Sequence, residues 1–138
     1  MKIIRNFTAY LVLLAAILAS GGCDIFKPSN DDLLTDHIWN FDRITTTSTN
    51  ETVQGIVTFA NAMMIGSTLQ FHTDGTYTIT MGDETDDGTW NLINDDEVLM
   101  MDTDEMIVIK LTKDELVLES EEVDNEYGTY TVTMCWEK

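Results

Sequence analysis

From residue 37 onward, hydrophobic and polar side chains alternate along most of the chain. Alternation with a period of two is typical of strands that bury one face, and the abundant Thr, Val, Ile, Tyr and Trp favour strands. Segments rich in Asp, Glu and Gly interrupt the alternation. The pattern predicts eight strands, over residues 38–47, 67–73, 76–81, 88–94, 97–102, 105–112, 115–123 and 127–137.

The connections between successive predicted strands are short. Asp74-Gly75 lies between two alternating segments and is a strong hairpin signal. Short loops join antiparallel neighbours, because parallel strands need a crossover of a dozen or more residues. Consecutive antiparallel strands with one apolar face close most simply into an up-and-down barrel, which also removes exposed edges. We therefore predict an all-β fold, an eight-stranded antiparallel barrel; a two-sheet β-sandwich is the alternative.

One segment departs from the alternation. Between the first two predicted strands, apolar residues recur at helical spacing. Ser48 with Glu51 three residues later has the form of a capping box, and Gly66 suits the C-terminal end of a helix. The alternative is a strand through Gly55 and Phe59. The predicted helix is a candidate lid over one mouth of the barrel, formed by Val53, Ile56, Val57, Ala60, Met63 and Met64.

The alternation also assigns an inner face to the barrel. In eight-stranded barrels the interior is either filled by side chains or holds one small ligand. The many large side chains on this face favour filling, and the scattered methionines suit either a core or a soft apolar lining. The candidate lining residues are Leu69, Phe71, Tyr77, Ile79, Met81, Trp90, Leu92, Ile107, Ile109, Leu116, Leu118, Tyr130, Val132, Met134 and Trp136.

The first 22 residues have a different composition from the rest of the chain. They contain Lys2, Arg5, an apolar run over residues 10–19 and the small residues 20–22, and then Cys23 follows. This order predicts a secretory signal peptide over residues 1–22. The apolar run is well short of the roughly 20 residues that a transmembrane helix needs. Residues 23–35, with the only proline, read as a tether, and residues 36–138 as the barrel domain.

The charge of the chain excludes one class of partner. It contains 25 Asp and Glu against 7 Lys and Arg, for a net charge of −18. Nucleic-acid binding requires clustered Lys and Arg to neutralise phosphates, so we expect no nucleic-acid partner. In an up-and-down barrel, the links after strands three, five and seven share one mouth. These links are acidic and contain no cation: Asp83, Glu84, Asp86, Asp87, Asp102, Asp104, Glu105, Glu121, Glu122, Asp124 and Glu126.

The sequence offers little catalytic chemistry. The two histidines, His37 and His72, have no partner at metal-ligand spacing, so we expect no metal site. No glycine-rich phosphate loop and no serine in a nucleophile elbow occurs. Cys135 has no base near it in sequence and is expected to be a small buried residue. We therefore predict a protein that is not an enzyme and has no cofactor.

Several motifs follow one another in the predicted domain. They are Leu34-Thr35-Asp36-His37-Ile38-Trp39, Leu69-Gln70-Phe71-His72-Thr73-Asp74-Gly75-Thr76-Tyr77, Gly88-Thr89-Trp90-Asn91-Leu92 and Leu116-Val117-Leu118-Glu119. The segment Ala19-Ser20-Gly21-Gly22-Cys23 is similar to the lipobox of bacterial lipoproteins, in which the cysteine is acylated. Together these motifs resemble the lipocalin-like lipoproteins of the Bacteroidota. The resemblance implies a calycin-type barrel in the cell envelope and no particular activity.

These observations lead to two functional hypotheses. In the first, Cys23 anchors the chain by acyl chains, in the outer rather than the inner membrane, and the barrel binds a small apolar or neutral molecule inside or at its mouth. In the second, the barrel is filled and serves as an interaction or inhibitor domain for an envelope protein partner. The two hypotheses differ in whether the barrel interior holds a ligand or is filled by side chains.

Overall fold

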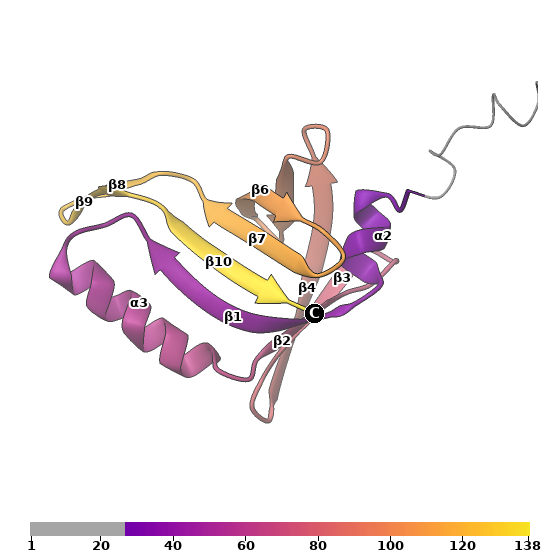
Figure 1. Cartoon of the computed structure of the whole chain (residues 1–138), viewed down its shortest axis with the longest axis horizontal. Coiled ribbons are helices and arrows are strands. Elements are labelled where there is room, and N and C mark those ends of the chain that lie inside the picture. Colours follow the sequence, from indigo (N-terminus) through magenta and orange to yellow (C-terminus); the bar gives the residue numbers. More distant parts are fainter. Residues whose placement is uncertain (1–26) are drawn as a thin grey trace, which may run out of the picture.

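The computed structural model describes residues 27–138, so the expected signal peptide and Cys23 lie outside the described residues. Eight antiparallel strands form a closed barrel in the order β1-β10-β7-β6-β5-β4-β3-β2 (Figure 1). This confirms the predicted all-β barrel. The strands are β1 (Ile38–Thr46), β2 (Thr68–Phe71), β3 (Thr76–Met81), β4 (Glu84–Ile93), β5 (Val98–Met101), β6 (Asp104–Leu111), β7 (Glu115–Ser120) and β10 (Val132–Glu137).

A short helix, α2 (Asn30–Thr35), precedes the barrel and closes one of its ends. Ser29 and Asp32 form a capping box, in which the Ser29 hydroxyl accepts from the Asp32 N–H at 3.1 Å and the Asp32 carboxylate accepts from the Ser29 N–H at 3.0 Å. Leu34 on this helix is fully buried, and its carbonyl accepts a hydrogen bond from the Trp39 indole N–H at 3.0 Å.

The predicted helix between the first two strands is α3 (Glu51–Met64). Its N-cap is Asn50 rather than Ser48, which corrects the predicted capping box. The Asn50 side chain accepts from the N–H groups of Thr52 and Val53 at 2.9 and 3.4 Å, whereas the Ser48 hydroxyl accepts from the Asn50 N–H. Gly66, at φ +80°, follows the last helical turn, as its sequence position indicated.

The last predicted strand, over residues 127–137, is divided into β9 and β10. Residues of β8 (Val123–Asn125) and β9 (Gly128–Tyr130) form a separate two-stranded sheet, which projects at the far left of Figure 1. The break lies at Thr131, whose N–H donates to the Thr47 hydroxyl at 2.8 Å and whose carbonyl accepts from the Thr46 hydroxyl at 2.8 Å. Tyr130 therefore belongs to this hairpin, and its prediction as a lining residue of the barrel is wrong.

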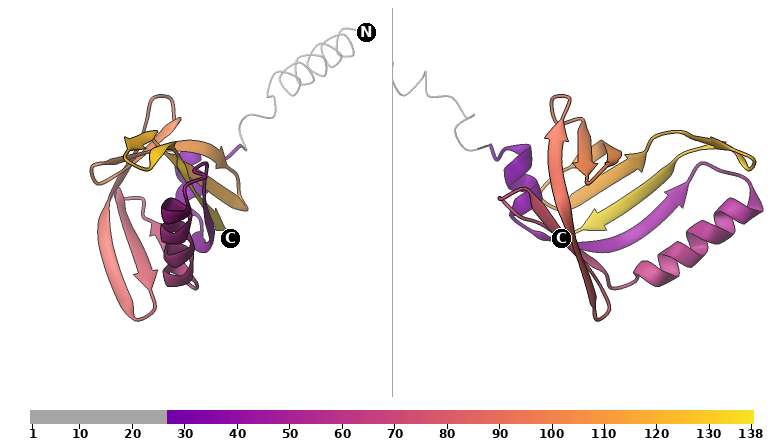
Figure 2. Two further views of the ribbon diagram at one scale, coloured as in Figure 1. Left: turned by 90° about the vertical axis from the view of Figure 1, so that its left-hand side faces the viewer. Right: turned by 180° about the vertical axis from the view of Figure 1, so that it is seen from behind.

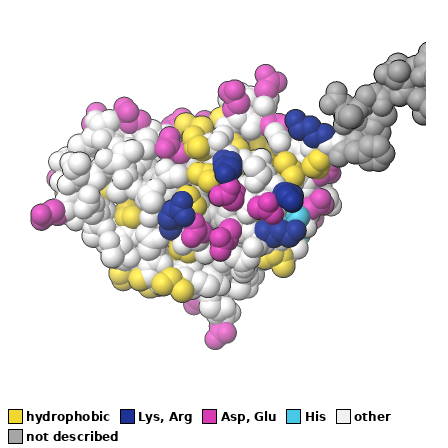
Figure 3. Space-filling model, viewed as in Figure 1, with side chains coloured by type: hydrophobic (Ala, Val, Ile, Leu, Met, Phe, Trp, Pro, Cys, Tyr) yellow, Lys and Arg dark blue, Asp and Glu magenta, His cyan; other side chains and the backbone are white. Residues whose placement is uncertain are grey.

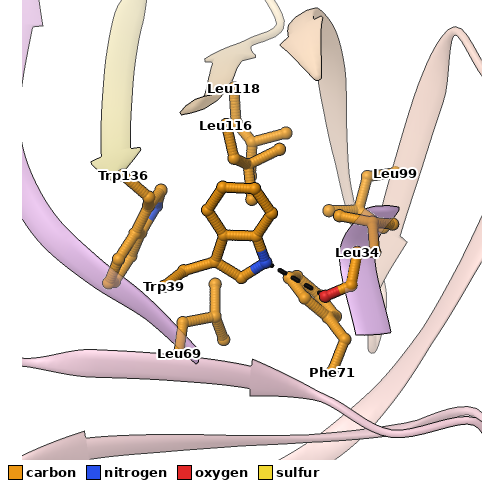
Figure 4. Packing of buried hydrophobic residues seen from close by; sticks show 8 residues of the cluster. All are labelled: Leu34, Trp39, Leu69, Phe71, Leu99, Leu116, Leu118 and Trp136. Carbon is orange, nitrogen blue, oxygen red and sulfur yellow. Dashed lines mark hydrogen bonds between the residues drawn. The ribbon is translucent and has the colours of Figure 1, made fainter. Parts of the chain in front are cut away.

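The core lies inside the barrel at the end that α2 closes. Its eight residues are at most 3% exposed, and they come from α2 and from five of the strands. Figure 4 shows their side chains converging around the Trp39 indole. These residues are Leu34, Trp39, Leu69, Phe71, Leu99, Leu116, Leu118 and Trp136.

Most of the predicted inner face is confirmed. Leu69, Phe71, Leu116, Leu118 and Trp136 belong to the buried core. Partly buried side chains pack against it, and those that the alternation had placed inside are Tyr77, Ile79, Trp90, Leu92 and Met134. Val132 and Met81 lie outside this cluster, and Met81 is exposed because the β3–β4 hairpin extends beyond the rest of the barrel.

The inward assignment of Ile107 and Ile109 is wrong. Both side chains are exposed, whereas Met106, Val108 and Leu111 pack against the core. The cause is a bulge in β6, where the pairing with β7 shifts register between residues 108 and 110. The extra residue puts Leu111 on the same face as Met106. Strict alternation counted back from Leu111 therefore places Ile109 and Ile107 inside, although they face outward.

Candidate functional site

The barrel interior, the first candidate site, is packed with its own side chains at the end that α2 closes. Phe71 and Trp90 meet edge to face with ring centroids 5.5 Å apart, and so do Phe41 and Trp136. Such contacts between large rings are typical of a packed core. The predicted lining residues that are buried therefore form a core and not a binding cavity.

A pocket of about 580 Å³ opens between the turn from β5 to β6 and the segment from β7 to β8. We call it the acidic pocket. Four of its eight lining residues are acids and none is a cation, while Met106 and Val123 supply apolar surface. It is formed by Thr103, Asp104, Glu105, Met106, Ser120, Glu121, Glu122 and Val123.

The acidic links predicted to share one mouth converge only in part. The links that follow β5 and β7 meet in the acidic pocket. The β3–β4 hairpin instead reaches the bottom of Figure 1, away from β8 and β9, and has a separate pocket of about 400 Å³, which is lined by Met81 and residues 84–86. The strong twist of β3 and β4, visible from behind in Figure 2, carries this hairpin out of the barrel wall.

A polar network ties β3 and the second half of β4 to Asp102, the residue that follows β5. The Tyr77 hydroxyl donates to the Asp102 carboxylate at 2.7 Å, and the same carboxylate accepts from the Thr89 N–H at 2.8 Å. Burial and the bond to Asp102 raise the pKa of Tyr77 to about 12, while the bond from Thr89 holds the pKa of Asp102 below its usual value. Neither group changes protonation near neutral pH, so this network positions three strands relative to one another instead of transferring protons.

The two histidines and Cys135 have structural contacts. His72 hydrogen-bonds the Thr78 hydroxyl at 3.0 Å, and the His37 ring packs against Trp39. Cys135 is buried, and burial raises the pKa of its thiol. Within residues 27–138, no three His, Cys, Asp or Glu side chains are grouped so that they could hold a metal ion.

Helix α3 does not cover the acidic pocket as a lid, because none of its residues lines that pocket. It packs along β1 instead (Figure 1). The pairing of β1 with β2 ends at Asn40, and beyond it the Asn61 side chain binds the β1 backbone. Its amide donates to the Ile44 carbonyl and accepts from the Ile44 N–H, both at 2.8 Å, so one side chain takes the place of a strand partner.

The side chains predicted for the lid divide into two faces of α3. Val53 is buried, and Val57, Ala60 and Met64 are half-buried on the face toward the barrel. Ile56 and Met63, also predicted for the lid, point away from the barrel and are exposed. At helical angles of about 100° per residue they lie on a flank of the helix together with Phe59.

This exposed flank is the surface that the sequence reasoning missed. We call Ile56, Phe59, Met63 and Ile65 the apolar stripe; each is between 58 and 78% exposed. Figure 3 shows hydrophobic side chains along the lower edge of the molecule, where α3 lies. The spacing of residues 56, 59 and 63 is the signal that could have revealed it, since it makes a second apolar row beside the buried one.

The fold and these surfaces define a small antiparallel barrel with a packed core at the end that α2 closes. No known family profile matches the sequence, and no curated protein matches it. The fold is similar to that of a DUF4847 family protein from Bacteroides vulgatus, with a TM-score of 0.52 and 14% identity. The match covers 77% of this chain and 96% of that protein. At this identity the similarity establishes the barrel fold alone.

In the part of the chain that the structure describes, no helix is long and apolar enough to span a membrane.

Proposed function

We propose that the chain is a lipid-anchored protein of the cell envelope whose barrel is an interaction domain without enzymatic activity. The packed core at the α2 end carries this proposal. Eight side chains at most 3% exposed occupy the space in which a ligand-carrying barrel would hold its ligand. Binding would then use the outer surface of the barrel.

The anchoring is supported by the sequence before the barrel. An apolar run, small residues and Cys23 occur in the order of a lipoprotein signal, and Ser29 at the start of α2 follows Cys23 by only six positions. Each buried acyl CH₂ contributes about 0.8 kcal/mol, so two or three acyl chains hold a protein stably where one does not. The resemblance to lipocalin-like lipoproteins favours the outer membrane.

A second candidate function is the binding of a small neutral or cationic molecule in the acidic pocket. The volume of about 580 Å³ favours it, because pockets for small ligands typically measure about 300–1,000 Å³. Four carboxylates without a cation would repel fatty acids and lipid phosphates. Met106 would supply the apolar contact.

Native mass spectrometry of the full chain, purified from its own host, tests the two functions. A filled barrel is expected to have the mass of the acylated polypeptide alone. A co-purified molecule that is lost in Met106→Trp but kept in Ile107→Trp would favour the pocket, because Met106 lines the pocket and Ile107 does not. A co-purified molecule that persists in both variants would contradict both assignments.

The anchor is tested separately with Cys23→Ser. This variant should lose the acyl mass and leave the membrane fraction, whereas Cys135→Ser should remain there as the matched control. If Cys23→Ser is still processed and membrane-bound like the parent, the anchor proposal is wrong.

A further inference from the structure

The apolar stripe has no partner within residues 27–138. The inner face of α3 is buried by other residues: Val53, Val57 and Met64 pack against β1 and the core. Phe59 and its neighbours in the stripe contribute nothing to that packing, and a large exposed aromatic side chain on a helix favours association with another apolar phase.

The charge around the stripe restricts the nature of that phase. The chain has 25 acidic residues, yet Glu51 is the single charged residue in the segment 50–67, which contains no Lys or Arg. A charged partner would therefore find no complementary group on this face. A second copy of the chain is disfavoured, because two strongly acidic domains repel each other and a stable interface takes about 20–30 residues a side. A neutral apolar surface is the occupant that fits.

The attachment of the tether places such a surface within reach. Residues 24–29 separate Cys23 from α2, and six extended residues reach about 20 Å. Helix α2 packs against β2, and α3 ends four residues before β2 begins. The four residues of β2 span about 13 Å at 3.3 Å per residue. The end of the stripe at Met63 and Ile65 therefore lies across the length of β2 from α2, where the tether leaves the domain (Figure 1).

We infer that the apolar stripe docks on the surface of the lipid bilayer that anchors the chain, with Phe59 at the boundary between headgroups and acyl chains. This inference rests on the proposed anchoring at Cys23. A short tether raises the effective concentration of the stripe at the bilayer, so a helix too weakly apolar to bind from solution binds when tethered. Because α3 has no Lys or Arg, docking needs no anionic lipid, unlike that of basic amphipathic helices.

Bromolipid quenching tests this docking in the full acylated chain, reconstituted into phosphatidylcholine vesicles with brominated acyl chains. Phe59→Trp places an indole in the stripe, and Thr58→Trp is the matched control on an exposed face of the same helix. The three native tryptophans lie in the barrel and contribute the same background to both variants. We expect quenching and a blue shift of the added indole in Phe59→Trp and neither in Thr58→Trp.

Changes within the stripe and in the lipid sharpen the test. Ile56→Ser with Met63→Ser, added to Phe59→Trp, should abolish the quenching of the new indole and leave the barrel folded, since both side chains face solvent. Replacing part of the phosphatidylcholine with phosphatidylglycerol should not increase the quenching. An increase with anionic lipid would overturn the inference.

Vesicle flotation separates failure of the inference from failure of the anchor. If the protein does not float with the vesicles, the anchoring is wrong. If it floats but the added indole of Phe59→Trp is quenched no more than that of Thr58→Trp, only the docking is wrong. A dimer in detergent that Phe59→Ser dissociates would also overturn the docking, in favour of a second copy as occupant.

Discussion

Gly88 offers a sharp test of the network between β3, β4 and β5. It pairs with Tyr77 across the sheet, and the Tyr77 ring lies directly over its Cα. A Cβ at residue 88 would come within 2.5 Å of Tyr77 Cε1 and 2.6 Å of Asp102 Oδ2. Because no Cβ sits this close to other atoms, Gly88→Ala must displace the ring and break its 2.7 Å hydrogen bond to Asp102.

The expected magnitude follows from two opposing effects. Overpacking of this kind costs about 1–3 kcal/mol. The loss of glycine's backbone freedom in the unfolded chain returns about 0.5–1 kcal/mol. We expect Gly88→Ala to lower the free energy of unfolding by about 1–2 kcal/mol. Gly55 in α3 provides the control, because a Cβ there meets nothing within 4 Å, so Gly55→Ala should raise the free energy of unfolding by about 0.5–1 kcal/mol.

Urea unfolding of residues 27–138, followed by tryptophan fluorescence, measures both changes. Opposite shifts of the midpoint at an unchanged slope are expected. In a Tyr77→Ala background the cost of Gly88→Ala should fall, because the ring that opposes the new methyl group is gone and only the Asp102 carboxylate still contacts it. A Gly88→Ala midpoint equal to that of the parent, or a cost of undiminished size without Tyr77, would refute the assigned packing.

Three further predictions concern the core, alkaline pH and salt. Trp136→Ala should lower the free energy of unfolding by about 3–5 kcal/mol in urea titrations, since the side chain is buried in the core; a parent emission maximum typical of exposed indole would contradict that burial. Tyr77, with its pKa raised to about 12, keeps its proton in the folded state while the unfolded chain loses it near pH 10. Stability should therefore fall as pH rises from about 10 to 12, and Tyr77→Phe should weaken this fall in thermal melts. Added NaCl should raise the melting temperature by screening repulsion among the acidic residues, and CaCl₂ at equal ionic strength should raise it no further; no response to salt would contradict the role of repulsion.

The sequence was sufficient for the barrel because alternation, short links and the Asp74-Gly75 turn all favour the same antiparallel order. The β2–β3 hairpin forms there as expected, with Gly75 at φ +85° and the Asp74 carboxylate accepting from the Thr76 N–H at 3.0 Å. Alternation failed where a single extra residue changed the phase, as in β6, or where a strand broke, as at Thr131. Bulges of this kind are set by pairing with a distant strand, which local patterns do not contain.

The candidate site was harder to predict than the fold. Helical spacing located α3 correctly, but it could not tell which of two apolar rows would be buried. That choice depends on Asn61, which orients the helix by binding the Ile44 backbone. The partial convergence of the acidic links likewise depends on the twist of β3 and β4, a property of the whole sheet.

The closing pair of strands, β1 and β10, has a consequence for how the barrel folds. It joins opposite ends of the domain, for example through the bond between the Thr46 hydroxyl and the Thr131 carbonyl, 85 residues apart. Contacts between such distant residues form late, because closing the long intervening loop costs conformational entropy before the contacts contribute any stabilisation. A chain that emerges from its N-terminus, whether from a ribosome or through a translocation channel, therefore cannot close the barrel until β10 has arrived. Until then β1 is unpaired along the side that β10 will occupy, and the barrel remains open.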